Sequence, residues 1–559
     1  MIVLLSGCVI ASFVFSVLCF IPEFGAAFWA FPLSLAVTVL LAAVSVRFVR
    51  NPVYRKLAVL RKILEYIPFI LFAAFIIRRS GSADGFFILD LLTVLCWIAV
   101  FILSFVTLYR LSDKRIQRHV PSFQFEKKRK KNVAVHILEW LDALIQAACL
   151  VLLVNLFFFQ LYAIPTESMV PEFMVKDRVV VVKTPSGPKF PLSEVGVPRL
   201  RDYKRGNIVV FNNPHYNDTK ADRVRSFVSQ LIYMLTFTSV NINVDEFGDV
   251  KADPLVKRVT GIPGEKLMLV DGILYSKTRT NPSWHQVTED ASWATWNLAA
   301  LPRTEYALVK DKLFSRDEFS LLESVESRRA ALDQTQYTKE SAELVKRFRS
   351  LKTTRDTVMR APDLFEGSRM EIFWLYKNNI EASRILLNTD GGAAWFDEFL
   401  TAWEVNPERD NLFNERTRNL NLLIKHTLAR LLVRNAELMQ DGKNAPEDYS
   451  TDAERIVLDT DMRLFLLYIS IHDQRNMGEF PPEEESYIPE DSYFMMGDNR
   501  FNSLDMRHSY VRRLIPLDNG DRYSILYRSN LEPRFVPAHM ILGTALFRFW
   551  PLSRAGVPQ

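Results

Sequence analysis

Residues 164–171 read Ile164-Pro165-Thr166-Glu167-Ser168-Met169-Val170-Pro171, and they lie where a long apolar run ends and a soluble region begins. We interpret Ser168 as a nucleophile. A serine hydroxyl attacks well only when a neighbouring base takes its proton, so this interpretation requires a base elsewhere in the chain. Taken alone, such a stretch more often forms a turn after a helix than a catalytic centre.

Two later stretches supply candidates for the missing groups. The candidate base is Lys257, in the stretch Val256-Lys257-Arg258-Val259-Thr260-Gly261-Ile262-Pro263-Gly264-Glu265. A third stretch, residues 497–507, reads Gly497-Asp498-Asn499-Arg500-Phe501-Asn502-Ser503-Leu504-Asp505-Met506-Arg507. Considered singly, the second stretch indicates a strand that ends in a Pro-Gly turn, and the third indicates a polar loop.

The three stretches in this order, behind an apolar N-terminal region, resemble the type I signal peptidases, the membrane-bound Ser/Lys-dyad serine proteases of the S26 family. The resemblance implies that Ser168 is the nucleophile and Lys257 the general base. It also implies that the Thr166 hydroxyl joins the Ser168 backbone N–H in an oxyanion hole, and that Ser503 orients Lys257. It implies no metal ion and no organic cofactor.

The resemblance covers the last apolar segment, residues 164–275 and residues 487 to about 550, which is roughly two fifths of the chain. Two further family elements correspond to Lys176-Asp177-Arg178-Val179 and to Arg205-Gly206-Asn207-Ile208-Val209-Val210-Phe211. The chain departs from the family at Glu167, where a small residue is common, and at Lys176, where glycine is usual. We interpret residues 508–534 as an inserted loop. None of these departures removes a group that the chemistry needs.

The remaining site residues are expected to bind substrate or to support the loop. An extended substrate would add as an edge strand beside residues 164–168 and the strand before Lys257. The predicted substrate cleft consists of Ile164, Pro165, Met169 and Val256. The predicted structural support of the site consists of Gly497, Asp498, Asn499, Arg500, Asp505 and Arg507. Asp505 and Arg507 are two positions apart, so we expect them to pair and to stiffen the loop that presents Ser503.

A lysine acts as a base only when it is neutral. Its ordinary pKa is near 10.4, and lowering it to about 8 requires about 3 kcal/mol, which burial in an apolar site can supply. In a strand, alternation would direct Arg258 to the face opposite Lys257. We therefore expect the neighbouring cation to lie away from the dyad.

The chain has 559 residues and is too long for one domain. The predicted fold is an N-terminal transmembrane helix bundle followed by a mostly β catalytic domain with a large helical insertion. The expected ranges are 1–163 for a transmembrane region of about five helices, 164–280 and 487–559 for the catalytic domain, and 281–486 for the insertion. Apolar stretches cover residues 2–20, 25–46, 63–77, 86–109 and 135–163; crossing a bilayer takes about 20 residues, so the third stretch is short.

Basic residues predict the orientation. They concentrate in residues 47–62 and 110–131, the latter including Lys127-Lys128-Arg129-Lys130-Lys131, so both loops are expected in the cytoplasm. Everything after Ile164 then lies outside the cytoplasmic membrane. The pair Arg78-Arg79 conflicts weakly with this scheme. We expect the acidic residues of the membrane segments, Asp90, Glu139 and Asp142, to lie near the interface or between helices rather than to form a proton path.

The soluble part changes character along its length. Strands are expected at 178–183, 207–211, 256–260, 266–270 and 273–275, with Asp271-Gly272 as a hairpin turn. Residues 304–476 show helical apolar faces, and Ser315 with Glu318 fits a capping box. We expect these residues to form an accessory cap with its own core. Residues 223–239 also have helical spacing, either for packing on the sheet or for lying on the bilayer.

Composition excludes several classes of function. The formal net charge is +5, and the one basic cluster flanks an apolar segment, so no nucleic acid is expected. All four cysteines lie in apolar segments, the eight histidines include no His-Glu-x-x-His pair, and no phosphate-binding glycine loop occurs. The hypothesis is a signal peptidase whose partners are the signal peptides of exported preproteins and membrane lipid. A specialised peptidase for a dedicated substrate and a non-catalytic membrane scaffold are the alternatives.

Overall fold

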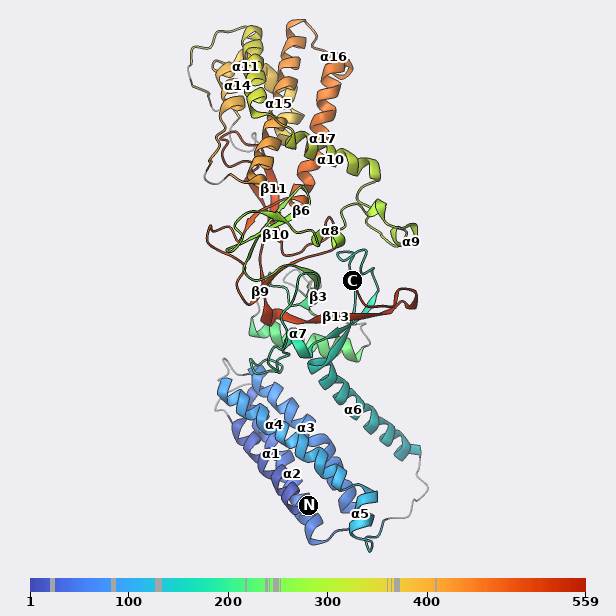
Figure 1. The fold of residues 1–559 in the computed structure, drawn as a ribbon. Helices are drawn as coiled ribbons and strands as arrows, with labels where there is room; N and C mark the ends of the chain where they lie inside the picture. Colours follow the sequence, from blue (N-terminus) through green and yellow to red (C-terminus); the bar gives the residue numbers. More distant parts are fainter. Residues whose placement is uncertain are drawn as a thin grey trace.

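The computed structural model describes residues 1–559 except 21–25, 82–86, 126–132, 217–218, 237–239, 241, 245–250, 252, 359, 363, 366–371 and 408–409. The basic run at 127–131 thus lies outside the described residues. The molecule is elongated, with a bundle of apolar helices at one end, a β region in the middle and a helical domain at the other end (Figure 1). The N-terminus lies at the end of the bundle that is distant from the β region.

The bundle consists of α1 (Ile2–Leu18), α2 (Ala30–Arg50), α3 (Tyr54–Gly81) and α4 (Phe87–Arg110), followed by the short α5 (Asp113–His119). α6 (Val133–Phe157) lies to one side (Figure 1). Within the described ranges, three helices are long and apolar enough to cross a membrane, Ala27–Arg50, Phe87–Arg110 and Val135–Phe157, while α1 is a shorter apolar helix. The short third stretch expected at 63–77 is the middle of the 28-residue α3. Charged residues at both ends of α3 concealed its length from the apolar pattern.

The last apolar run is not helical throughout. α6 ends at Phe157, and Phe159–Ala163 forms strand β1, which pairs antiparallel with β2 (Arg178–Val182). Both elements are apolar, so composition alone did not separate them. α6 contacts α3 through Asp142, whose carboxylate accepts hydrogen bonds from the Tyr66 hydroxyl at 2.6 Å and from the Lys62 amine. Of the two expected positions for Asp142, near the membrane interface or between helices, the structure shows the second.

A buried ion cluster joins the bundle to the β region. Asp90 lies 3.2 Å from Arg78 and 3.3 Å from Arg79, and it accepts a hydrogen bond from the Ser193 hydroxyl at 2.7 Å. Arg78 and Asp90 are 1% and 2% exposed. Phe190 of the same β-region loop contacts the rings of Phe72, Phe75, Trp97 and Phe157. The two arginines that conflicted with the charge pattern are thus paired with a carboxylate, and they fix a loop of the β region on the bundle.

The β region contains two antiparallel sheets and a separate hairpin. The seven-stranded sheet has the order β1, β2, β13 (Ile541–Trp550), β3 (Ile208–Phe211), β4 (Leu255–Gly261), β9 (Ser492–Met496), β12 (Val536–Pro537). The second has the order β7 (His285–Gln286), β6 (Ile273–Thr278), β5 (Glu265–Val270), β8 (Met477–Phe480). Asp271 and Gly272 form the β5–β6 turn with φ of 53° and 78°, so the predicted hairpin is confirmed. Strands from both ends of the soluble part alternate in one sheet, since β13 lies between β2 and β3.

Helix α7 (Lys220–Leu235) corresponds to the amphipathic stretch predicted at 223–239, of which residues 237–239 lie outside the described residues. It lies on the side of the sheet that faces the bundle (Figure 1). Among its described side chains only Ser229 is buried, and none belongs to a hydrophobic cluster of the sheet. α7 is therefore not a core helix of the β region.

The insertion is helical, as predicted. It begins with α8 (Asp290–Trp293) and α9 (Arg303–Tyr306) and continues through α10 (Arg316–Ala330), α11 (Gln334–Leu351), α12 (Ile372–Lys377), α13 (Asn379–Asn388), α14 (Gly392–Thr401), α15 (Leu412–Gln440), α16 (Pro446–Thr451) and α17 (Ala453–Arg475). The capping box of Ser315 and Glu318 is present at the start of α10. Arg329 of α10 binds the Asp271 carboxylate, and Arg475 of α17 donates to its carbonyl at 2.8 Å. These bonds attach the helical domain to the β5–β6 turn.

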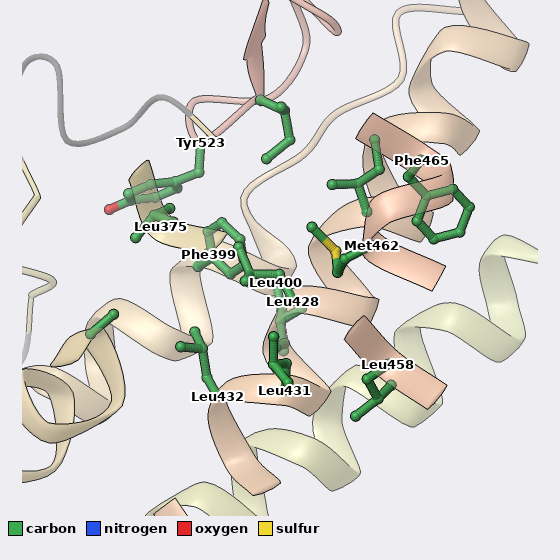
Figure 2. Packing of buried hydrophobic residues seen from close by; sticks show 14 of the residues in the cluster. Leu375, Phe399, Leu400, Leu428, Leu431, Leu432, Leu458, Met462, Phe465 and Tyr523 are labelled. Carbon is green, nitrogen blue, oxygen red and sulfur yellow. The ribbon is translucent and has the colours of Figure 1, made fainter. Parts of the chain in front are cut away.

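Residues 508–534 are not simply a loop. They contain a hairpin of β10 (His508–Pro516) and β11 (Leu526–Leu531), whose irregular register hid the strand alternation from the sequence. The hairpin region contributes Leu517, Tyr523, Ile525 and Tyr527 to the core of the helical domain. Figure 2 shows Tyr523 beside Leu375 and Phe399. Most of this core comes from residues 304–476, as expected, but it is not wholly their own, because their apolar faces also cover this hairpin.

The Asp90 cluster makes a testable contribution to stability. Asp90→Ala would remove the carboxylate that two buried guanidinium groups bind, and we expect it to lower the free energy of unfolding by about 3–5 kcal/mol. Thermal unfolding and limited proteolysis in detergent measure this loss. Asp113→Ala is the control, because Asp113 pairs with Arg61 while 59% exposed, and such a pair contributes at most about 1 kcal/mol. Equal stabilities of the two variants would contradict the structural role of Asp90.

Candidate active site

Ser168 lies in a turn that leaves the sheet and returns to it. The Ile164 N–H donates to the Asp177 carbonyl and the Lys176 N–H donates to the Ile164 carbonyl, both at 2.8 Å, so the two ends of the turn are joined. Ile164 and Met169 are buried among strand residues, whereas Pro165 and Thr166 are exposed and Val256 is half-buried. The structure thus brings the predicted cleft residues around one turn.

Lys257 approaches Ser168 from β4. Its amine donates a hydrogen bond to the Ser168 hydroxyl over 2.6 Å, and the Thr166 hydroxyl lies 3.3 Å from the same oxygen. Ser168 is 8% exposed and Lys257 3% exposed. Burial lowers the pKa of Lys257 to about 8, although the nearby carboxylates of Asp505 and Asp498 oppose this shift. Near neutral pH a useful fraction of the amine is therefore unprotonated, and it can accept the serine proton.

Arg258 points away from this amine, as strand alternation predicted. Its guanidinium binds both carboxylate oxygens of Asp498, at 2.8 Å and 2.6 Å, and both side chains are 2% exposed. It also donates to the Gly206 carbonyl at 3.0 Å. Burial raises the pKa of Asp498 and the Arg258 guanidinium counteracts this shift. The cation that follows Lys257 in the strand is thus paired with a carboxylate on the opposite face of β4.

The loop after β9 is fixed by a buried ion pair. Asp505 and Arg507 lie 2.8 Å apart and are fully buried, so the pairing expected from their spacing is confirmed. Asp505 also accepts the Gly497 N–H at 2.9 Å, and Arg507 donates to the Arg500 carbonyl at 3.1 Å. Burial alone would raise the pKa of Asp505, but the Arg507 guanidinium holds it well below its usual range. Asp505 thus remains a carboxylate and keeps the loop closed.

Gly497 and Ser503 lie directly against the turn that carries Ser168. A Cβ atom at Gly497 would come within 3.0 Å of the Ser503 hydroxyl and of the Ser168 carbonyl oxygen, so this close approach requires glycine. Ser503 is 6% exposed, and its hydroxyl has no hydrogen-bond partner in the part of the chain that the structure describes. The structure therefore brings Ser503 to the site but gives it no hydrogen bond to Lys257.

Asn499 and Arg500 connect the loop to its neighbours. The Asn499 backbone N–H donates to the Ser168 carbonyl and its side-chain amide donates to the Glu167 carbonyl, both at 3.1 Å. Arg500 binds Asp290 at 2.9 Å, and Asp290 is 2% exposed. Asp290 had not been recognised from the sequence, because its partner lies 210 positions away and a single aspartate carries no signal.

The two departures from the family pattern have structural counterparts. Lys176 has a φ of 74°, in the left-handed region that favours glycine. For a residue with a side chain this backbone conformation is less favourable than the right-handed one by about 1–2 kcal/mol. The Glu167 carboxylate accepts hydrogen bonds from the backbone N–H groups of Lys310 at 2.6 Å and Asp311 at 3.1 Å. It is thus bonded to the first part of the insertion.

One edge of β4 is open beside Ser168. Residues 255–258 pair with β3, whereas the pairing of β4 with β9 begins at Arg258. The β9 side of residues 255–257 therefore has no strand partner among the described residues. An unpaired strand edge of this kind can bind an extended peptide through main-chain hydrogen bonds.

Two comparisons with known proteins identify the family. The family model described as "Signal peptidase, peptidase S26" matches residues 137–317 and 429–550, more than half of the chain. The chain is also 26% identical over 197 residues to "Signal peptidase I P" of Bacillus subtilis subsp. natto, a match that covers 34% of this chain and 79% of that protein. The class is therefore that of the serine peptidases. Within it, the chain belongs to the S26 signal peptidase family. The bundle α1–α5 and residues 318–428 of the helical domain lie outside the match.

Proposed function

We propose that the protein is a signal peptidase I that cleaves the signal peptides of exported preproteins with Ser168 as nucleophile and Lys257 as general base. The observation that carries the proposal is the 2.6 Å hydrogen bond between the buried Lys257 amine and the Ser168 hydroxyl. A buried amine with a pKa near 8 next to a hydroxyl is the combination that an activated serine needs. A non-catalytic scaffold has no use for it.

The reaction follows from the positions of these groups. Neutral Lys257 takes the Ser168 proton as the hydroxyl oxygen attacks the carbonyl carbon of the scissile peptide bond. The Ser168 N–H and the Thr166 hydroxyl donate to the resulting oxyanion, and losing one such donor typically costs about 100-fold to 1000-fold in rate. The protonated Lys257 gives its proton to the leaving amine. Lys257 then deprotonates a water molecule that hydrolyses the Ser168 ester and restores the free enzyme.

The same geometry supports a mode of substrate binding. The substrate residues before the scissile bond would add as a strand to the open edge of residues 255–257. Ile164, Met169 and Val256 line the turn and strand on either side. The small side chains that the family accepts near the scissile bond would fit such walls. Ser503 would bind the Lys257 amine when the substrate excludes water from the site.

The specialised peptidase remains the second candidate, on one observation. Arg500 next to the nucleophile turn is bonded to Asp290 at the start of the helical insertion. A domain attached this closely to the site is suited to select one folded or extended preprotein. Cleavage of several unrelated preproteins with similar kcat/KM would exclude a dedicated substrate.

The proposal includes an orientation, with the β region and the helical domain outside the cytoplasmic membrane and several helices crossing it. It is supported by the basic residues at 47–62 and by the apolar helices whose ends meet the β region.

Substitution of either dyad residue tests the chemistry. We expect Ser168→Ala and Lys257→Ala each to lower kcat on a signal-sequence peptide by at least about 1000-fold while the protein stays folded, because each removes a group that no neighbour replaces. Ser283→Ala and Lys204→Ala, both exposed positions, are matched controls that should cleave normally. Near-normal cleavage by Ser168→Ala would reject the dyad.

The pH dependence tests the state of Lys257. Because the amine acts only when neutral and burial lowers its pKa to about 8, kcat/KM should rise about tenfold per pH unit below pH 8 and level off above it. Initial rates between about pH 6 and about pH 10 measure this profile. A profile that is flat across this range, or that levels off near pH 6.5 as for a histidine base, would contradict the assignment.

The orientation is tested by labelling. In a variant without the four native cysteines, Ser283→Cys should react with a membrane-impermeant maleimide in intact spheroplasts, whereas Ser122→Cys should react only after lysis. Both positions are exposed. Labelling of residue 122 alone in intact cells would place the site in the cytoplasm and overturn the substrate class.

A further inference from the structure

We propose that Glu167 is a positioning residue, which binds the first part of the helical insertion and thereby holds the Ser168 N–H in the direction that the oxyanion requires. The inference rests on the proposed function. It makes residues 298–311 part of the active-site support rather than a linker to a separate cap.

The first observation is the environment of the carboxylate. Glu167 is 6% exposed, and its two oxygens accept hydrogen bonds from consecutive backbone N–H groups, at 2.6 Å from Lys310 and 3.1 Å from Asp311. Bonds to an ionised acceptor are shorter and stronger than neutral ones. A residue directly before the nucleophile is therefore fixed to a segment more than 140 positions away.

The second observation concerns the peptide bond between Glu167 and Ser168. The Glu167 carbonyl accepts hydrogen bonds from the Asn499 side-chain amide and from the Val170 N–H, both at 3.1 Å. In a trans peptide the carbonyl and the following N–H point in opposite directions. Fixing the carbonyl of Glu167 thus fixes the direction of the Ser168 N–H, which is the proposed oxyanion donor.

A small apolar cluster backs the same contact. Residues of the nucleophile turn meet residues of the insertion in a cluster of Val170, Met174, Leu298 and Val309. Asn502, from the loop that carries Ser503, donates to the Asp311 carboxylate at 3.2 Å. The segment 309–311 therefore contacts both loops that form the site, and the Glu167 carboxylate is its direct polar bond to the nucleophile turn.

Without the carboxylate, the contacts of segment 309–311 with the turn that the structure describes are apolar. The bonds of Asn499 and Val170 to the Glu167 carbonyl remain, but the turn loses its polar attachment to the insertion, and we expect the Ser168 N–H and hydroxyl to shift out of alignment. Misplacement of reacting groups by about 1 Å costs about 100-fold in rate. Peptide binding depends on the strand edge at 255–257 and should be affected little.

The test uses the full-length protein in detergent and a short signal-sequence peptide. We expect Glu167→Ala to lower kcat by about 10-fold to 100-fold with KM changed less than about threefold. Glu167→Gln keeps an oxygen that can accept one of the two N–H bonds and should recover most of the kcat. Glu323→Ala is the matched control: it removes an exposed glutamate of α10 outside segment 298–311, so its kcat should equal that of the unchanged protein.

Hydrogen exchange supplies a readout besides activity. The amides of residues 310 and 311 should exchange faster in Glu167→Ala and normally in Glu323→Ala. Wild-type kcat in Glu167→Ala, or a change in KM alone, would overturn the proposal.

If Glu167→Ala does not fold, Glu167→Asp takes its place in the test. Its carboxylate is one methylene group too short to reach both N–H groups, so wild-type kcat in Glu167→Asp would equally refute the proposal. Ser168→Ala distinguishes failure of the proposed function from failure of the positioning role. Full activity of Ser168→Ala would reject the proposed function. An inactive Ser168→Ala together with a fully active Glu167→Ala would reject only the positioning role.

Discussion

The rest of the structure depends on burying the amine of Lys257, with its pKa lowered to about 8, against the hydroxyl of Ser168. Burial favours the neutral form of Lys257, but any unpaired ion nearby would disturb it. In this fold the charged side chains around Lys257 form ion pairs with one another. Arg258 binds Asp498 across β4, and Arg507 binds Asp505 in the adjacent loop. Each guanidinium is thus occupied by its own carboxylate, and the Lys257 amine is left to bond with Ser168.

This arrangement requires segments from distant parts of the chain to meet. The seven-stranded sheet brings them together because β13 inserts between β2 and β3, and β9 pairs with β4. The nucleophile turn then lies between the end of β1 and the loop after β9, where glycine at 497 permits contact with the Ser168 carbonyl. The Asp90 cluster fixes the same β region on the helix bundle. The position of the site relative to the apolar helices is therefore built into the fold.

The sequence predicted the features that depend on near neighbours. The Asp271-Gly272 hairpin, the Ser315–Glu318 capping box and the Asp505–Arg507 pair each involve residues at most three positions apart, so local rules apply. The dyad is predicted from three recognisable stretches in the order that the family has, and the structure places the two side chains 2.6 Å apart. The partners of Asp90, Glu167 and Asp290 were not predicted, because each lies far along the chain and a single carboxylate does not identify the group that binds it. Strand β1 was not predicted, because it follows the apolar helix α6 directly and is equally apolar, so no change in composition marks where the helix ends.

The helical domain is joined to the catalytic region at more than one point, and this determines how the two can behave. Its core includes Tyr523 and Ile525 from the hairpin that follows the Ser503 loop, and Arg329 and Arg475 bind the β5–β6 turn. Asp290 binds Arg500, and the Lys310 N–H binds Glu167. Because contacts of residues that share partners are not additive, displacing the helical domain would act on the nucleophile turn and on the Gly-Asp-Asn-Arg loop together. A domain that shares its core and a buried ion pair with the loops around Ser168 is packed against them and is not merely tethered by its two ends.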